Sequence, residues 1–197
     1  MVNTQEMLQE MEIYAEEKNI PIMTKEGINF LTKYIEKYNI KKILEIGAAI
    51  GYSSIMMALV SEDIEITTIE RDEKRYLEAV KNIKKFNLES RINLIYKDAF
   101  DVSLTEQYDL IFIDADKAQN IKFFEKFSKN LNPKGTIITD NMNFHGLTEK
   151  DPEDIKSRNL RSLVRKLNDY RQYLKENEQY ETDFLDIGDG LAISRPQ

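Results

Sequence analysis

Lys41-Lys42-Ile43-Leu44-Glu45-Ile46-Gly47-Ala48-Ala49-Ile50-Gly51-Tyr52-Ser53 is the stretch that decides the fold of this 197-residue chain. The apolar run from Ile43 to Ile46 is typical of a buried strand, and the small residues from Gly47 to Gly51 indicate a tight turn. A helical pattern begins at Tyr52. This order of strand, turn and helix lets a backbone approach a bound nucleotide closely and direct helix N–H groups at it. The alternative is an ordinary turn that binds no ligand.

Beyond this stretch, short β-branched runs alternate with helical patterns along most of the chain. We expect strands at 41–47, 64–70, 92–98, 108–114 and 135–140, and helices at 52–60, 73–87 and 118–130. The alternation predicts an α/β fold of the doubly wound, Rossmann-like kind, in which helices cover both faces of a mostly parallel sheet.

The two ends of the chain have different patterns. Helices are expected at 4–18 and after Thr24, a helix N-cap residue type, so that residues 1–40 pack on the core. A long helix is expected at 152–176, followed by strands near 180–187 and 190–195. The turn residues Gly188-Asp189-Gly190 separate these strands, which predicts an antiparallel hairpin at the sheet edge. The length fits a single domain covering 1–197.

The composition excludes several classes of function. The chain has no cysteine and one histidine, His145, which argues against thiolate metal sites, a cysteine nucleophile and a serine–histidine triad. No role is assigned to His145. No apolar run is long enough to span a membrane, and the N-terminus has no signal-peptide pattern, so we expect a cytoplasmic protein. The net charge of -7 argues against a protein that binds nucleic acid nonspecifically, but it does not exclude a local basic patch.

Ligands of open parallel sheets bind outside the carboxyl ends of the strands. The second expected strand ends in Glu70, about twenty residues after the glycine turn, where an acid can accept hydrogen bonds from both ribose hydroxyls of a nucleotide cofactor. The spacing of the glycines favours S-adenosylmethionine over a nicotinamide cofactor. It lacks the dinucleotide fingerprint, and no Gly-Lys-Ser/Thr of a P-loop follows it.

Two further strand ends carry oxygen ligands. Asp114 follows one expected strand, and Asp140 and Asn141 follow the next. Two carboxylates and an amide oxygen that converge would suit a hard cation such as Mg²⁺. The alternative is that each aspartate caps the next helix. Lys117 lies three residues after Asp114, and two positive charges beside it, a divalent cation and a sulfonium, would favour its neutral form as a general base.

The chain resembles the cation-dependent O-methyltransferases, the family that includes catechol and caffeoyl-coenzyme A O-methyltransferases. The matching segments are Ile43 to Ser53, Tyr108-Asp109-Leu110-Ile111-Phe112-Ile113-Asp114-Ala115-Asp116-Lys117, Gly135-Thr136-Ile137-Ile138-Thr139-Asp140-Asn141, His145-Gly146 and Gly188-Asp189-Gly190-Leu191. Within the family it is most similar to bacterial tRNA 5-hydroxyuridine methyltransferases, through Tyr14-Ala15-Glu16-Glu17, Ile20-Pro21-Ile22-Met23 and the ending Leu191-Ala192-Ile193-Ser194.

The resemblance implies a class I methyltransferase fold, a homodimer and a set of site residues. It implies Lys117 as the catalytic base and Asp114, Asp140 and Asn141 as metal ligands. The residues that it implies around S-adenosylmethionine are Met23, Gly47, Ser53, Glu70, Asp98 and Asp114. Two positions depart from the family pattern. Ala49 replaces the middle glycine of the turn, a change that is tolerable if φ stays negative there, and Lys97 replaces a common glycine before Asp98.

The substrate is expected to carry two neighbouring oxygens. The 4-oxo and 5-hydroxy groups of 5-hydroxyuridine at the tRNA wobble position meet this need, and so does a catechol-type small molecule. A tRNA anticodon arm would need basic contacts, and Arg158, Arg161 and Arg165 share one face of the long helix. The alternative is that these arginines lie on an ordinary solvent-exposed helix face with no binding role. A nucleotide-binding module without catalysis is the alternative from another class, and a nicotinamide oxidoreductase is a weaker third.

Overall fold

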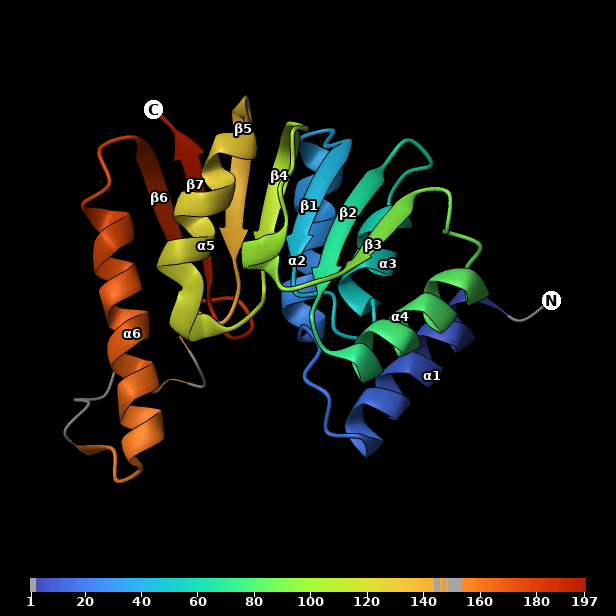
Figure 1. Cartoon of the computed structure of the whole chain (residues 1–197), viewed down its shortest axis with the longest axis horizontal. Coiled ribbons are helices and arrows are strands. Elements are labelled where there is room, and N and C mark those ends of the chain that lie inside the picture. Colours follow the sequence, from blue (N-terminus) through green and yellow to red (C-terminus); the bar gives the residue numbers. More distant parts are fainter. Residues whose placement is uncertain (1–2, 144–145, 147, 149–153) are drawn as a thin grey trace. The chain divides into compact units, whose positions relative to one another are not determined.

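The computed structural model describes residues 3–143, 146, 148 and 154–197. The chain forms two compact units, Met1–Val102 and Ser103–Gln197 (Figure 1). Within the described parts, no helix combines the length and the apolar character that crossing a membrane requires.

The first unit is built on three parallel strands in the order β3-β2-β1. Their bounds are β1 (Lys42–Ile46), β2 (Glu65–Glu70) and β3 (Ile92–Tyr96). Its helices are α1 (Thr4–Glu17), α2 (Lys25–Lys37), α3 (Tyr52–Ala58), α4 (Glu73–Lys85) and the short 3-10 helix η1 (Ala99–Asp101). The helices α1 and α4 run side by side (Figure 1), and an ion pair between Glu10 and Lys85 joins them.

Side chains at the helix starts satisfy backbone donors that have no partner within the helix. Asn3 and Glu6 form a reciprocal capping box at the start of α1. The Thr24 hydroxyl accepts a hydrogen bond from the N–H of Gly27, which confirms Thr24 as the N-cap of α2. Asp72 does the same for Arg75 at the start of α4.

The second unit is built on four strands in the order β4-β5-β7-β6. They are β4 (Tyr108–Ile113), β5 (Leu131–Thr139), β6 (Tyr180–Leu185) and β7 (Leu191–Pro196). Parallel pairing joins β4 to β5, whereas β7 is antiparallel to both β5 and β6, so the predicted C-terminal hairpin is confirmed. The helices of this unit are η2 (Lys117–Gln119), α5 (Asn120–Phe127), η3 (Ser128–Asn130) and α6 (Arg158–Lys175).

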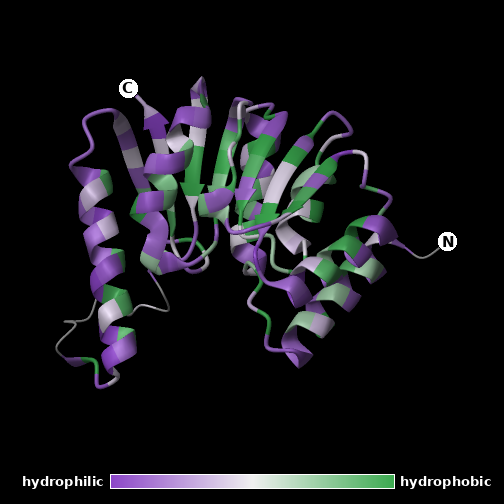
Figure 2. Ribbon diagram, viewed as in Figure 1, coloured by the Kyte–Doolittle hydropathy of each residue, from purple (hydrophilic) through white to green (hydrophobic). Residues whose placement is uncertain are grey.

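The core of each unit lies between its strands and helices. Most strands are largely hydrophobic, whereas β6 is mainly hydrophilic, and the helices carry hydrophilic outer faces (Figure 2). This pattern is expected for a sheet covered by amphipathic helices. In the second unit, Phe124 of α5 contacts Tyr170 and Tyr173 of α6 edge-on, with ring centroids 6.4 Å and 5.8 Å apart. The Tyr170 hydroxyl reaches Thr139 of β5 at 2.8 Å, which ties α6 to the strand that precedes the candidate metal site.

The sequence pattern placed the elements well but missed three boundaries. The strand expected at 135–140 begins earlier, at Leu131. The helix expected at 118–130 divides into η2, α5 and η3. The long helix begins at Arg158 instead of 152, because the hydroxyl of Ser157 accepts a hydrogen bond from the Leu160 N–H and acts as its N-cap.

Candidate functional site

The turn after β1 requires left-handed backbone at three of its five residues. The φ angles are 102° at Gly47, 46° at Ala49 and 82° at Gly51. The condition set from the sequence, a negative φ at Ala49, is therefore wrong. The left-handed conformation lets the N–H of Ala49 reach the carboxylate of Glu70 at 2.8 Å, and this bond helps to hold an alanine where glycine is easier.

Glu70 is positioned by the backbone on two sides. One carboxylate oxygen accepts the Ala49 N–H, and the other accepts the N–H of Asp72 at 2.7 Å. The side chain is 7% exposed, so it is fixed at the end of β2. A carboxylate has room for about four hydrogen bonds, so the two lone pairs left can accept two ribose hydroxyls. Gly47 lies beside it, since its N–H donates to Ile69 at 3.0 Å. The structure thus brings two predicted cofactor residues together.

The Ser53 hydroxyl is held by a buried acid. It donates to the buried carboxylate of Glu45 at 2.5 Å. Glu45 also accepts hydrogen bonds from Ser54 and, at 2.5 Å, from Thr68. Because its proton is engaged, the Ser53 hydroxyl can face a ligand as an acceptor. Glu45 itself was not predicted as a site residue, although an acid inside the apolar run Ile43 to Ile46 is a signal for one.

Met23 and Asp98 complete the cofactor residues predicted in the first unit. Met23 is buried and packs against Gly27, where an added Cβ would lie 3.0 Å from the Met23 methyl carbon. Asp98 follows β3 and caps η1, because it accepts the Phe100 N–H at 2.9 Å, while its other oxygen pairs with Arg71 at 3.3 Å. Asp98 is therefore held in place as the N-cap of η1. The sixth residue, Asp114, belongs to the second unit.

The predicted metal ligands converge at the ends of β4 and β5. The amide nitrogen of Asn141 donates to Asp114 at 3.0 Å, and the backbone N–H of Asn141 donates to Asp140 at 2.7 Å. The N–H of Asp140 bonds to Ile113, which fixes the two strand ends together. Asn141 has a positive φ of 64°, a conformation that asparagine adopts more readily than most residues. Neither aspartate caps a helix in the described structure, so the capping alternative is not realised here.

Burial dominates the electrostatics of this pair. It raises the pKa of Asp114, a shift that the charge of Lys117 and the Asn141 hydrogen bond oppose and the charge of Asp189 reinforces. Burial and the neighbouring Asp114 charge raise the pKa of Asp140 to about 7. Two carboxylates that resist ionisation together are a place where a cation would be stabilising.

The donor set fits a hard cation. Among the described residues, no three His, Cys, Asp or Glu side chains lie close enough together to hold a metal. The side-chain N–H of Asn141 donates a hydrogen bond to Asp114, which leaves the amide oxygen of Asn141 for another partner. Two carboxylates, one amide oxygen and ligands from water or substrate match what Mg²⁺ prefers. Lys117, in η2, is close enough for its charge to act on both aspartates.

Arg171 of α6 clamps the loop that follows the candidate metal ligands. Its guanidinium donates to the Met142 carbonyl at 3.4 Å and to the Asn143 side chain at 3.2 Å, and it stacks over Phe184 at 4.8 Å. Met142 and Asn143 also donate backbone N–H groups to the turn between β6 and β7. A Cβ added to Gly190 would lie 2.7 Å from the Asn143 nitrogen, so only glycine fits there. Sequence reasoning did not predict these contacts of Arg171.

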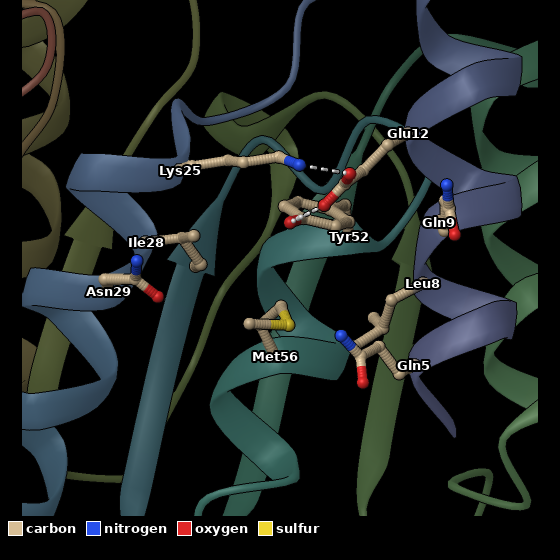
Figure 3. Close-up of a pocket in the computed structure, with 9 residues that line it drawn as sticks. All are labelled: Gln5, Leu8, Gln9, Glu12, Lys25, Ile28, Asn29, Tyr52 and Met56. Carbon is tan, nitrogen blue, oxygen red and sulfur yellow. Dashed lines mark hydrogen bonds and ion pairs between the residues drawn. The ribbon is translucent and has the colours of Figure 1, made fainter. Parts of the chain in front are cut away.

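A cavity of about 380 Å³ lies among α1, α2 and α3 in the first unit (Figure 3). At one end Glu12 accepts a hydrogen bond from Tyr52 at 2.8 Å and pairs with Lys25 at 2.9 Å. Burial raises the pKa of Glu12, but these two partners outweigh it and leave the pKa below its usual value. Leu8 and Met56 lie along its other end (Figure 3). Since its charged residues satisfy each other, this cavity offers little to a charged ligand.

The arginines predicted to contact RNA differ in their surroundings. Arg158 and Arg165 are exposed, whereas the guanidinium of Arg161 donates to the Ile155 carbonyl at 3.1 Å and 2.9 Å. Arg161 therefore holds the segment before α6. His145 lies outside the described residues.

Comparisons with known proteins show which family this chain resembles. The family model described as O-methyltransferase matches residues 1–197. The caffeoyl-CoA O-methyltransferase of Populus kitakamiensis is 29% identical over 191 residues, which cover 92% of this chain and 80% of that protein. A crystal structure from Staphylococcus aureus, described as a candidate caffeoyl-CoA O-methyltransferase, is 39% identical with a TM-score of 0.92, and the match covers 96% of this chain and 92% of that one.

An O-methyltransferase from Bacillus cereus, solved in complex with S-adenosylhomocysteine, is 25% identical with a TM-score of 0.83 and covers 100% of this chain and 93% of that one. These likenesses confirm the α/β fold expected from the sequence, with mostly parallel strands and an antiparallel C-terminal pair.

Proposed function

This chain belongs to the O-methyltransferase family, and we propose that it methylates the 5-hydroxyl group of 5-hydroxyuridine at the tRNA wobble position. S-adenosylmethionine is the proposed methyl donor and Mg²⁺ the proposed cation. The observation that carries the proposal is the convergence of Asp114, Asp140 and Asn141 beside Lys117, because this set suits an oxygen substrate held next to a cation.

The donor is proposed to bind at the ends of β1 and β2. Glu70 presents a fixed carboxylate for ribose hydroxyls, and the turn from Gly47 to Gly51 brings backbone close to the ligand. The Bacillus cereus relative was solved with the demethylated product of this donor, which supports the choice. The hydroxyl of Ser53 and the side chains of Met23, Asp98 and Asp114 are the further proposed contacts.

The reaction class forms a bond between the methyl carbon and a substrate oxygen while the bond from that carbon to sulfur breaks, leaving S-adenosylhomocysteine. The substrate hydroxyl loses one proton, which Lys117 is proposed to accept. Asp114, Asp140 and Asn141 would hold the cation, whose chemistry in such a site is to favour the ionised hydroxyl and fix its orientation.

A catechol-type small molecule is the second candidate substrate, because the Populus relative is named for caffeoyl-CoA. Both substrates present two neighbouring oxygens. The deciding experiment measures methyl transfer from labelled S-adenosylmethionine, with and without Mg²⁺, to bulk tRNA and to a catechol panel. We expect label in tRNA only when Mg²⁺ is present. Label in catechols alone would contradict the proposed tRNA substrate. Transfer at the same rate in the presence of a chelator would contradict the proposed need for Mg²⁺. The cytoplasmic location and the homodimer stay predictions.

The role of Lys117 is tested by Lys117→Ala. Removing the proton acceptor should lower turnover by roughly 10²- to 10⁴-fold, the usual contribution of general base catalysis. Binding of the donor and of Mn²⁺, followed by calorimetry, should persist. Lys129→Ala in η3 is the matched control, since it removes an exposed lysine of the same unit. Full turnover in Lys117→Ala would discard the role.

A further inference from the structure

A cavity of about 440 Å³ lies between η2, α5 and α6 in the second unit. It falls within the roughly 300–1,000 Å³ typical of small-molecule sites. Lys117 is part of its lining, and the same lysine acts on Asp114 and Asp140. The cavity therefore adjoins the proposed general base.

Its lining holds three lysines, Lys117 among them, and two acidic residues. Lys122 of α5 and Lys166 of α6 line the cavity, and neither has a hydrogen bond or an ion pair to another residue in the described parts of the chain. Glu125 and Asp169 lie in the same lining but pair with neither lysine. The chain as a whole has a net charge of -7, so two lysines without an ion pair in one cavity differ from its overall acidic character.

A second observation points to a missing acceptor. Asn120 also lines the cavity and is 3% exposed, and its amide nitrogen is the one buried side-chain donor or acceptor without a partner among the described residues. Buried donors of this kind usually have a partner. Asn120 opens α5 directly after η2, and its own backbone N–H bonds to the Lys117 carbonyl. The buried amide donor and the two lysines together favour an anion such as phosphate.

We propose that this cavity holds a ribonucleotide next to the methylated base, with its phosphate on Lys122 and Lys166. The carboxylates of Glu125 and Asp169 are placed to accept hydrogen bonds from sugar hydroxyls, which RNA carries and DNA lacks at the 2′ position. The inference rests on the proposed tRNA substrate and specifies how the anticodon arm is gripped near the reactive base. Exposed Arg158 and Arg165 on α6 extend the positive charge beyond the cavity.

The test measures how strongly the binding of a wobble-position stem-loop RNA depends on salt. Each neutralised phosphate contributes about 0.7 to 0.9 to the slope of log affinity against log salt. The double variant Lys122→Gln with Lys166→Gln removes both proposed contacts to one phosphate, so we expect the slope to become shallower by about 0.7 to 0.9. The control Lys129→Gln with Lys134→Gln removes the same charge from exposed positions outside the cavity and should keep the wild-type slope.

Two additions keep the result interpretable. Lys122→Arg with Lys166→Arg keeps both charges and should restore the slope, and circular dichroism checks that every variant is folded. A slope that changes equally in both glutamine pairs, or in neither, overturns the inference. The inference is also overturned if Lys122→Gln with Lys166→Gln binds the stem-loop RNA as well as the wild type but loses affinity for a coenzyme A thioester, which also carries phosphate. The proposed function is tested separately by methyl transfer with the wild-type protein, because the salt dependence of RNA binding is measured without catalysis.

Discussion

Ala49 has the least favourable backbone in the donor-site turn. An L-residue with side chain at a φ of 46° carries a penalty of roughly 1–2 kcal/mol that glycine avoids. Ala49→Gly should therefore raise the free energy of unfolding, by up to about 1 kcal/mol after the extra freedom of glycine in the unfolded chain is subtracted. Urea denaturation measures the difference. Ala49→Val, with a branched side chain at the same φ, should be destabilising. A lower free energy of unfolding in Ala49→Gly than in the wild type would show that the turn is not strained.

Asp140 gives the metal-free protein a pH-dependent stability. Its pKa is about 7 in the folded chain and about 4 when unfolded. Between these values the folded state binds more protons, so the stabilising contribution is complete below pH 4 and is lost as the pH rises through 7. Denaturation in the presence of a chelator should show a fall on the order of a few kcal/mol from pH 5 to pH 8.

The variant Asp140→Asn cannot ionise at this position, so its fall in stability over the same pH range should be smaller, and Asp114, whose pKa burial also raises, accounts for the part that remains. Asp101→Asn, at an exposed position of the first unit, is the control and should behave as the wild type. An unchanged pH profile in Asp140→Asn would assign the effect to other groups.

At the scale of elements, α6 supports the candidate metal site through Arg171. This residue ties the loop after β5 to the helix, so its loss should loosen Asn141 without touching a proposed ligand. Partners of this kind usually change metal affinity by about 10- to 100-fold. We expect Arg171→Gln to weaken Mn²⁺ binding, measured by electron paramagnetic resonance, within that range. Arg165→Gln on the same helix is the control, and equal affinity in both variants would leave Arg171 a packing role only.

At the scale of the whole molecule, an acidic chain must bind RNA through a local surface. Reversing Arg158 and Arg165 to Glu should weaken tRNA binding by more than reversing Lys129 and Lys134, which carry the same charge elsewhere. Arg161 is left intact because its bonds to Ile155 hold the chain before α6. Filter binding at low salt measures the difference. Equal losses would mean that overall charge, and not this helix face, governs the affinity.

The sequence predicted the fold because its local signals agree. The apolar run before Gly47, the β-branched strands and the Gly188–Gly190 turn each favour the element that forms there. It also predicted that Asp114, Asp140 and Asn141 converge, since neighbouring parallel strands end at one edge. It could not predict Arg171, the engagement of Arg161 or the unpartnered amide of Asn120. These depend on contacts between residues far apart along the chain, which leave no periodic pattern.

The contact between the loop after Asn141 and Gly190 also sets an order of events during synthesis. Asn143 and Met142 bond to a turn that the ribosome makes some fifty residues later, near the end of the described chain. The loop beside the proposed metal ligands therefore stays without its backbone partners until that turn has emerged and β7 has paired with β5. The loop can therefore support the proposed metal ligands only after the C-terminal hairpin has formed.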